Sequence, residues 1–159
     1  MDLVVFIGLQ AAGKTSFFQA RFALTHAHVS KDLYAKSARN KGARQVREIE
    51  AALVEGQSVV VDNTNPTRTE RGELVTLARR HGARAVGYYF QSVLAECLER
   101  NARRPGRARI PDVGLYSTST LLELPSFEEG FDELSYVQLG EGQEFRVSPW
   151  RASDEARDA

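Results

Sequence analysis

The stretch from residue 8 to residue 15 constrains the fold of this 159-residue chain more than any other. It follows the apolar run Leu3–Ile7 and leads into an amphipathic segment. It reads, in order, Gly8, Leu9, Gln10, Ala11, Ala12, Gly13, Lys14 and Thr15. This is the pattern G-x-x-x-x-G-K-[ST], which forms a phosphate-binding loop when a strand precedes it and a helix follows it. The sequence therefore predicts a strand–loop–helix unit that binds a nucleoside triphosphate.

The end of this loop carries the side chains that would contact the nucleotide. The glycines let backbone N–H groups converge at the positive end of the next helix. Lys14 would add a full charge near the β- and γ-phosphates, and the Thr15 hydroxyl would be a ligand for Mg²⁺. Ser16 follows directly and is counted with the nucleotide site, whose expected ligands are ATP and Mg²⁺. The alternative is a chance match in an ordinary glycine turn.

Strand patterns alternate with helix patterns along the whole chain. Strands are expected at Leu3–Ile7, His26–Ser30, Ser58–Val61, Ala85–Phe90, Leu134–Leu139 and Glu144–Val147. Helices are expected at Lys14–Leu24, Ala38–Glu55, Thr67–His81, Ser92–Asn101 and Pro111–Leu122. This order predicts an α/β fold, a three-layer α/β/α sandwich with a mainly parallel sheet. Residues 1–150 would form a single domain and residues 151–159 a flexible C-terminal tail.

The composition of the chain bears on the cellular compartment in which the protein is expected. The first apolar run has only five residues, and no stretch approaches the ~20 apolar residues of a membrane span. We therefore expect neither a signal peptide nor a membrane segment. The single cysteine, Cys97, excludes an internal disulfide and suits a cytoplasmic protein.

Asp32 follows the predicted strand that ends at Ser30. In a parallel sheet, ligands gather at the carboxyl ends of the strands. A carboxylate at this place can accept the proton of an attacking hydroxyl and orient it toward a γ-phosphate. The alternative is that Asp32 only caps the helical turn that follows.

The segment Asp62-Asn63-Thr64-Asn65-Pro66 follows a second apolar strand. An acid at this position is a partner for the Mg²⁺ site in P-loop proteins. The alternative is an Asx-type turn that ends the strand at Pro66. The two roles can coexist.

Arginines are concentrated between residues 100 and 109. The five are Arg100, Arg103, Arg104, Arg107 and Arg109. A guanidinium binds phosphate oxygens bidentately, and Arg100 and Arg104 are one helical turn apart. An anionic partner is favoured over a merely solvated loop because so many neighbouring cations repel one another.

The net charge of zero hides a strong asymmetry. Residues 1–110 carry 18 basic and 10 acidic side chains, whereas residues 111–159 carry 3 basic and 11 acidic ones. Such a division is typical of a protein with a polyanion-binding surface. Two oppositely charged faces that serve only solubility are the alternative.

Taken together, the chain resembles the polynucleotide 5′-hydroxyl kinases, especially the kinase module of the eukaryotic 3′-phosphatase/5′-kinase repair enzymes. The resemblance spans about residues 3–140 and rests on Gly8–Thr15, His28–Asp32, Val61–Pro66 with Arg71, Arg100–Arg104, Ile110–Val113 with Tyr116, and Leu124-Pro125 with Glu129-Gly130-Phe131. It implies a P-loop kinase domain with an arginine-rich lid. The phage and bacterial members have an arginine three residues after the catalytic aspartate, where this chain has Ala35.

The resemblance also implies roles for single residues. Asp32 would be the general base, and Lys14 and Arg104 would complete the catalytic set. Arg100 and Arg104 would bind the nucleotide, and Asp32, Asn65 and Arg71 would lie on the acceptor side. The phosphoryl acceptor would be a 5′-hydroxyl end of DNA or RNA, and any phosphatase or ligase would be a separate partner protein.

Other functions are compatible with the same motifs. P-loop kinases of this size also phosphorylate small metabolites, nucleosides or antibiotics. A non-catalytic ATP-binding module or switch is a further alternative, which would show slow turnover with every acceptor and a large nucleotide-dependent shift in melting temperature.

Overall fold

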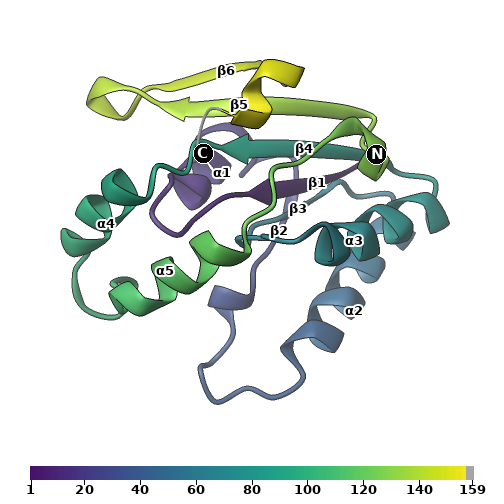
Figure 1. Cartoon of the computed structure of the whole chain (residues 1–159). Helices are drawn as coiled ribbons and strands as arrows, with labels where there is room; N and C mark the ends of the chain where they lie inside the picture. The colour runs from purple at the N-terminus through teal and green to yellow at the C-terminus, as the bar shows by residue number, and fades with distance from the viewer. Residues whose placement is uncertain (157–159) are drawn as a thin grey trace.

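The computed structural model describes residues 1–156, and its strands form one six-stranded sheet in the order β2-β3-β1-β4-β5-β6 (Figure 1). The strands are β1 Asp2–Ile7, β2 Ala27–Val29, β3 Val59–Val61, β4 Arg84–Phe90, β5 Glu133–Leu139 and β6 Phe145–Pro149. The first five run parallel to their neighbours, and β6 is antiparallel to β5. The predicted mainly parallel sheet with a closing strand pair is confirmed.

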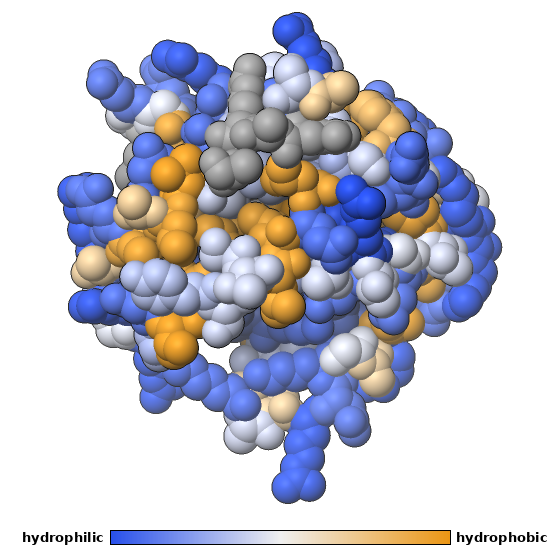
Figure 2. Space-filling view, viewed as in Figure 1, coloured by the Kyte–Doolittle hydropathy of each residue, from blue (hydrophilic) through white to orange (hydrophobic). Residues whose placement is uncertain are grey.

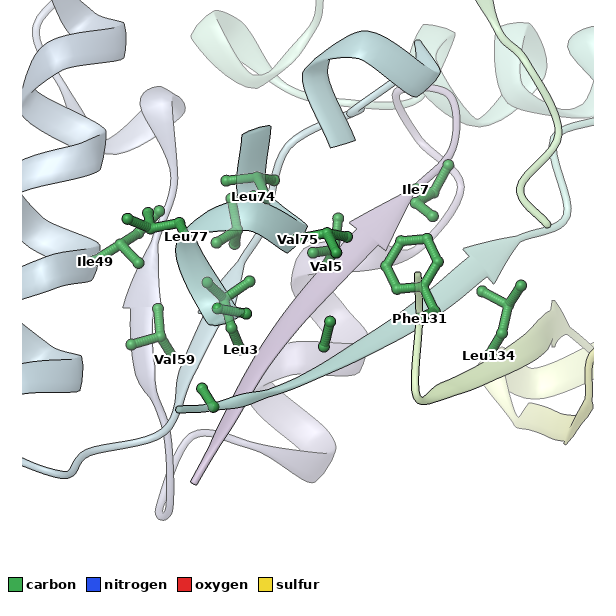
Figure 3. Close-up of a cluster of buried hydrophobic side chains, with 14 of the residues drawn as sticks. Leu3, Val5, Ile7, Ile49, Val59, Leu74, Val75, Leu77, Phe131 and Leu134 are labelled. Atoms are coloured by element: carbon green, nitrogen blue, oxygen red, sulfur yellow. The ribbon is translucent and has the colours of Figure 1, made fainter. Parts of the chain in front are cut away.

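Helices cover both faces of the sheet and make three layers (Figure 1). They are α1 Lys14–Arg21, α2 Lys41–Val54, α3 Arg68–Arg80, α4 Leu94–Ala102 and α5 Asp112–Leu121. Alternate side chains of β1 point to opposite faces of the sheet. Leu3, Val5 and Ile7 pack with α2 and α3, as Figure 3 shows, whereas Val4 and Phe6 pack with α1, α4 and α5. The apolar run therefore reads as continuous because the central strand is buried on both faces.

Two predicted helices are shorter than expected. The helix after the phosphate-binding loop ends at Arg21, because a turn closes on the Phe22 carbonyl, which accepts from the N–H groups of Thr25 and His26. The second helix begins at Lys41, because Asn40 has a left-handed conformation with φ 55°. Residues 22–24 instead lie between α1 and β2, and residues 38–40 belong to the segment between β2 and α2.

The C-terminal segment differs from the predicted flexible tail. Residues Ala152–Ala156 form a 3₁₀ turn, and the buried Asp154 carboxylate accepts from the Arg151 N–H at 2.8 Å. Trp150 packs edge-on to Tyr89 at a centroid distance of 5.3 Å. The tail is thus folded at least to Asp154, and residues 157–159 of the prediction lie outside the described residues. No helix within the described part of the chain is long and apolar enough to cross a membrane.

Candidate active site

The loop between β1 and α1 has a backbone path that requires glycine at two positions. Gly8 has φ +152°, and a Cβ there would lie 3.0 Å from both the Phe90 carbonyl oxygen and Ser92 Oγ. Gly13 has φ +98° and forms the N-terminal cap of α1. The loop is also braced by the segment that follows β4, because the Leu9 N–H donates to Ser92 Oγ at 3.0 Å. The motif glycines thus allow close approach to β4 and the start of the helix.

The Lys14 side chain lies folded across this loop. It is 8% exposed, and its Nζ donates to the carbonyl oxygens of Gly8 at 2.9 Å and Leu9 at 2.5 Å. Burial lowers the pKa of Lys14 to about 8, and the nearby charge of Asp62 opposes that shift. The ammonium is therefore held in place but poorly solvated.

Thr15 and Asp62 meet at the start of α1. Thr15 Oγ1 donates to Asp62 Oδ2 at 2.8 Å, and His28 Nε2 lies 2.9 Å from the same oxygen. Asp62 is 2% exposed, and the His28 ring stacks on Phe18 at a centroid distance of 3.9 Å. The part of the chain that the structure describes holds no cluster of three or more histidine, cysteine or acidic side chains suited to a metal. A hydroxyl beside a carboxylate nevertheless fits Mg²⁺, which takes one or two protein ligands besides phosphate and water.

The contact of His28 with Asp62 is a feature that the sequence did not reveal. The two residues are 34 positions apart and meet because β2 pairs with β3, with His28 opposite Val60. The only signal in the sequence was the presence of His26 and His28 on alternate positions of a short strand. That pattern does not say which residues lie opposite.

Asp32 lies in the 3₁₀ turn Lys31–Leu33, directly after β2. The cap of this turn is Ser30, whose Oγ accepts from the Asp32 N–H at 3.2 Å. The alternative that Asp32 is the helix cap is therefore wrong, and its exposed carboxylate is available for another role.

The turn that carries Asp32 is fastened to β3 and α2. The Lys31 N–H donates to Asn63 Oδ1 at 2.9 Å, and Asn63 Nδ2 donates to Gln45 Oε1 at 2.6 Å. Gln45 is buried at 7% exposure. Asn63 and Gln45 thus position the Asp32 turn relative to the sheet, a role that the sequence analysis did not assign.

A small cavity of about 50 Å³ brings the predicted catalytic residues together. Asp32, Lys14 and Arg104 all line it. The remaining lining residues are Gln10, Ala11, Thr15, Asp62, Asn63, Thr64 and Ile110. They come from four segments of the chain, namely the phosphate-binding loop, the turn after β2, the turn after β3 and the arginine-rich lid. The predicted meeting of these segments at the carboxyl ends of the strands is therefore present in the structure.

A larger cavity of about 520 Å³ adjoins the other side of the loop. Its lining residues are Ala11, Gly13, Ser16, Glu96, Glu99, Arg100, Arg103, Arg104, Leu139, Gly140, Gly142 and Phe145. Ala11 and Arg104 belong to both cavities, so the two lie side by side. The C-terminal strand pair forms one wall, a role that no local pattern in the sequence predicts.

The lid arginines differ in their contacts. Arg100 Nε donates to the Ala11 carbonyl oxygen at 2.6 Å and so braces the phosphate-binding loop. Arg103 forms an exposed ion pair with Glu99 at 2.6 Å. Within the part of the chain that the structure describes, Arg104 donates only to the Ala108 carbonyl oxygen at 3.3 Å, a contact within the lid itself. Arg104 also lines both cavities, so it is the lid arginine that lies beside the phosphate-binding loop on both sides.

Arg71 and Asn65 were expected on the acceptor side, and the structure places both in the interior. Arg71 is fully buried, paired with Glu129 at 2.7 Å and hydrogen-bonded to the Asn65 and Pro66 carbonyl oxygens. Asn65 is 6% exposed, and its Nδ2 donates to the Phe6 carbonyl oxygen at 2.7 Å. Neither side chain is free to contact a substrate directly. They instead hold the turn that carries Asp62 and Asn63, because its buried carbonyl groups need donors.

Comparison with known proteins agrees with this arrangement. The family model described as "AAA domain" matches residues 3–115. A putative bifunctional polynucleotide phosphatase/kinase of Acanthamoeba polyphaga mimivirus is 31% identical over 86% of this chain. A bifunctional polynucleotide phosphatase/kinase of Schizosaccharomyces pombe is 26% identical over the same share. The chain spans about a third (33%) of the length of each of these relatives.

Solved structures with low sequence identity share the fold. Kti12 of Chaetomium thermophilum, in complex with ADP-AlF3, matches with a TM-score of 0.66 and 17% identity over 89% of this chain and 92% of its own. A gluconokinase of Sinorhizobium meliloti has a TM-score of 0.63 and 20% identity over 89% and 85%. A fungal RNA kinase has a TM-score of 0.64 and 15% identity over 89% and 39%. With its phosphate-binding loop, its parallel sheet and a family match over more than half of its length, this chain belongs to the AAA domain family and has a P-loop kinase fold.

Proposed function

We propose that the protein is an ATP-dependent kinase that transfers the γ-phosphoryl group to the 5′-hydroxyl end of DNA or RNA. The observation that carries the proposal is the cavity in which Asp32, Lys14 and Arg104 converge. It offers a base for a hydroxyl and two cations for a transferring phosphoryl group at one place.

The donor nucleotide would occupy both cavities. Its nucleoside part fits the larger one, between the lid and the wall formed by Phe145 and Leu139. Its phosphates would lie over the loop N–H groups and the start of α1. Thr15 and Asp62 would hold Mg²⁺, which neutralises charge on the β- and γ-phosphate oxygens when it is bound.

The reaction needs little covalent chemistry from the protein. Asp32 accepts the proton of the acceptor hydroxyl as its oxygen bonds to the γ-phosphorus. The bond from that phosphorus to the oxygen shared with the β-phosphate breaks, and ADP leaves. Lys14 and Arg104 stabilise the charge on the transferring group, and Asn63 keeps the Asp32 turn in position.

A polynucleotide acceptor is favoured over a metabolite on two grounds. The relatives with the higher sequence identity carry names that include polynucleotide kinase. The likeness to the gluconokinase concerns the fold alone. In addition, Asp32 is exposed at the mouth of its cavity rather than enclosed in a pocket that would surround a small substrate.

A direct acceptor assay tests the proposal. The protein would be incubated with γ-labelled ATP and Mg²⁺ and with 5′-hydroxyl DNA, 5′-hydroxyl RNA and a panel of sugars and nucleosides. We expect label on an oligonucleotide. Label on a sugar or nucleoside alone would assign the protein to metabolite kinases, and turnover with none of them would indicate a nucleotide-binding module.

Asp32→Asn tests the mechanism within that assay. The amide has nearly the same shape but cannot accept the proton, so we expect a loss of transfer on the order of 10²-fold or more with ATP affinity retained. Ser37→Ala, on the exposed loop beyond the turn, is the matched control and should keep the wild-type rate. Transfer at the wild-type rate by Asp32→Asn would remove Asp32 from the role of base.

A further inference from the structure

The Asp62 carboxylate receives two hydrogen-bond donors on one oxygen and leaves its other oxygen free. Thr15 Oγ1 lies 2.8 Å and His28 Nε2 lies 2.9 Å from the same oxygen, Oδ2. Within the described part of the chain, Oδ1 makes no hydrogen bond or ion pair, and Asp62 lines the small cavity. Oδ1 is therefore the oxygen that is available to a ligand in that cavity.

The same carboxylate has no lysine or arginine in direct contact. Asp62 is 2% exposed, yet among the described residues neither type of side chain lies within 4.0 Å of its oxygens. The Lys14 ammonium donates to loop carbonyl groups instead. By contrast, the buried Glu129 carboxylate pairs with Arg71 at 2.7 Å. A buried carboxylate that keeps its charge without such a partner suits a cation supplied from outside the chain.

The His28 ring is held in place by packing outside the cavity. It stacks on Phe18 of α1, with a centroid distance of 3.9 Å and an interplanar angle of 15°. The parallel pairing of β2 with β3 places His28 opposite Val60, so its side chain reaches the turn that follows β3. His28 is not among the described residues that line the small cavity. The imidazole thus contacts Asp62 away from the space that a ligand would enter.

Solvent does not supply the donors to Oδ2. In Figure 1 the segment between β2 and α2 hangs below the sheet, and Figure 2 shows mostly hydrophilic side chains along the same lower edge. Asp62 lies in the adjoining turn, where Asn63 Oδ1 accepts from the Lys31 N–H at 2.9 Å, but Asp62 itself is buried. Its hydrogen bonds therefore come from protein groups, and His28 provides one of the two.

The contact between His28 and Asp62 can orient the carboxylate without neutralising it. An ionised carboxylate only accepts hydrogen bonds, so the donor is the Nε2–H of the ring. An imidazole in its neutral form donates this hydrogen bond and leaves the negative charge in place, whereas an arginine would also cancel the charge. Hydrogen-bond partners of this kind fix the orientation of metal-binding carboxylates, and their loss typically lowers metal affinity about 10- to 100-fold.

We propose that His28 is a positioning residue for Mg²⁺, an inference that rests on the magnesium site of the proposed function. The imidazole holds Oδ2 of Asp62, so that Oδ1 faces the ion or a water bound to it. The alternative is a histidine that only packs on Phe18. Loss of a positioning residue weakens the effect of Mg²⁺ on nucleotide binding and leaves binding without Mg²⁺ unchanged, whereas loss of a packing residue affects both equally.

The test measures the Kd of AMPPNP, an ATP analogue that is not hydrolysed, with saturating Mg²⁺ and in EDTA. The ratio of the two Kd values reports how strongly Mg²⁺ and the nucleotide support each other's binding. His28→Phe keeps a ring against Phe18 but removes the donor. His28→Gln and His28→Met have side chains of similar length, and only the glutamine can donate. The matched control is His26→Phe, the same exchange at a ring that lies edge-on to Phe22 and not beside Asp62.

We expect the ratio of Kd values to fall by about tenfold or more in His28→Phe and His28→Met. His28→Gln should recover most of the wild-type ratio, and His26→Phe should keep it. In EDTA, all four variants should bind AMPPNP with the wild-type affinity. Thermal unfolding checks the fold of each variant, and the comparison of His28→Gln with His28→Met decides the question if His28→Phe does not fold.

The outcomes separate this inference from the proposed function. If His28→Phe and His28→Met keep the wild-type ratio, or lose affinity equally with and without Mg²⁺, the inference fails and the proposed kinase function stands. If Mg²⁺ does not strengthen AMPPNP binding by the wild type, the magnesium site fails and the inference with it. A wild type that phosphorylates no oligonucleotide, but whose His28 variants lose the ratio as expected, would overturn the proposed acceptor and support the inference.

Discussion

Lys14 is the residue at which folding and binding oppose each other most directly. A charge near the nucleotide phosphates is needed for binding, yet the same ammonium is almost fully removed from water in the folded protein. Its carbonyl contacts with Gly8 and Leu9 replace part of the lost hydration. The lowered pKa shows that this replacement is incomplete.

The lowered pKa of Lys14 predicts that the free energy of unfolding depends on pH. The pKa of Lys14 is about 8 in the folded protein against an ordinary value of 10.5, so the unfolded chain binds more protons between these values. Stability therefore rises with pH across that window. Relative to Lys14→Met, the wild-type free energy of unfolding should rise by about 2 kcal/mol between about pH 7 and pH 9.5.

Urea unfolding of wild type and Lys14→Met at both pH values measures this difference. Lys31→Met, at an exposed lysine, is the control and should show no such change. A constant difference between wild type and Lys14→Met across the range would contradict the buried, partly neutral lysine.

At the scale of elements, the turn after β3 joins the cavity of the proposed catalytic groups to the core. Asp62 and Asn63 line that cavity, whereas Asn65 has φ 43° and points inward. Arg71 of α3 and Glu129 of the 3₁₀ turn Phe127–Glu129 hold the far side of this turn. The geometry of this turn therefore depends on an ion pair that is buried in the interior.

Substitution of Arg71 should destabilise the whole domain. Arg71→Met leaves the Glu129 carboxylate buried without its partner, and loss of one member of a buried pair costs about 3–5 kcal/mol. Arg68→Met, on the same helix, removes an exposed pair with Glu123 at 3.9 Å and should cost less than about 1 kcal/mol. Denaturant unfolding of both variants compares the two, and similar small losses would show that the Arg71 pair is dispensable.

At the scale of the whole molecule, segments from the N-terminal and the C-terminal parts of the chain meet at the larger cavity. The loop after β1 forms one side of the larger cavity, and β6 with the turn before it forms another. A Cβ on Gly13 would lie 3.3 Å from Phe145 Cε1, so the ring of Phe145 rests directly on the phosphate-binding loop. The C-terminal strand pair is therefore part of the site as well as the edge of the sheet.

This contact predicts a specific loss of nucleotide affinity. Phe145→Ala removes an apolar wall of the cavity, so we expect ATP affinity to fall by roughly tenfold, or about 1.4 kcal/mol. Val147→Ala, at a 44% exposed position of the same strand, should keep the wild-type affinity. Thermal shift measures both, since a ligand at 100 times its Kd stabilises by about 2.7 kcal/mol. Equal shifts in the two variants would place the nucleoside elsewhere.

Local sequence patterns were sufficient to predict the order of strands and helices and the functional residue types that follow the strands. The phosphate-binding loop, the alternation of strands and helices, and the exposed acid after β2 are each encoded within a few neighbouring residues, so periodicity and loop chemistry reveal them. The predicted end of α1 and the predicted start of α2 were less accurate, because a helix end depends on the backbone conformation of a single residue, such as Asn40.

The sequence by itself determined a P-loop α/β sandwich with Asp32, Lys14 and the lid arginines near one edge of the sheet. Only the tertiary structure decided that Arg71 is a buried partner of Glu129, that His28 meets Asp62, and that Phe145 lines the larger cavity beside the phosphate-binding loop. These pairs are far apart in the chain, so they depend on strand order and register, which no local pattern encodes. The sequence does not distinguish an arginine that faces a phosphate from an arginine that pairs with a buried carboxylate, because the two differ only in how they pack in the folded protein.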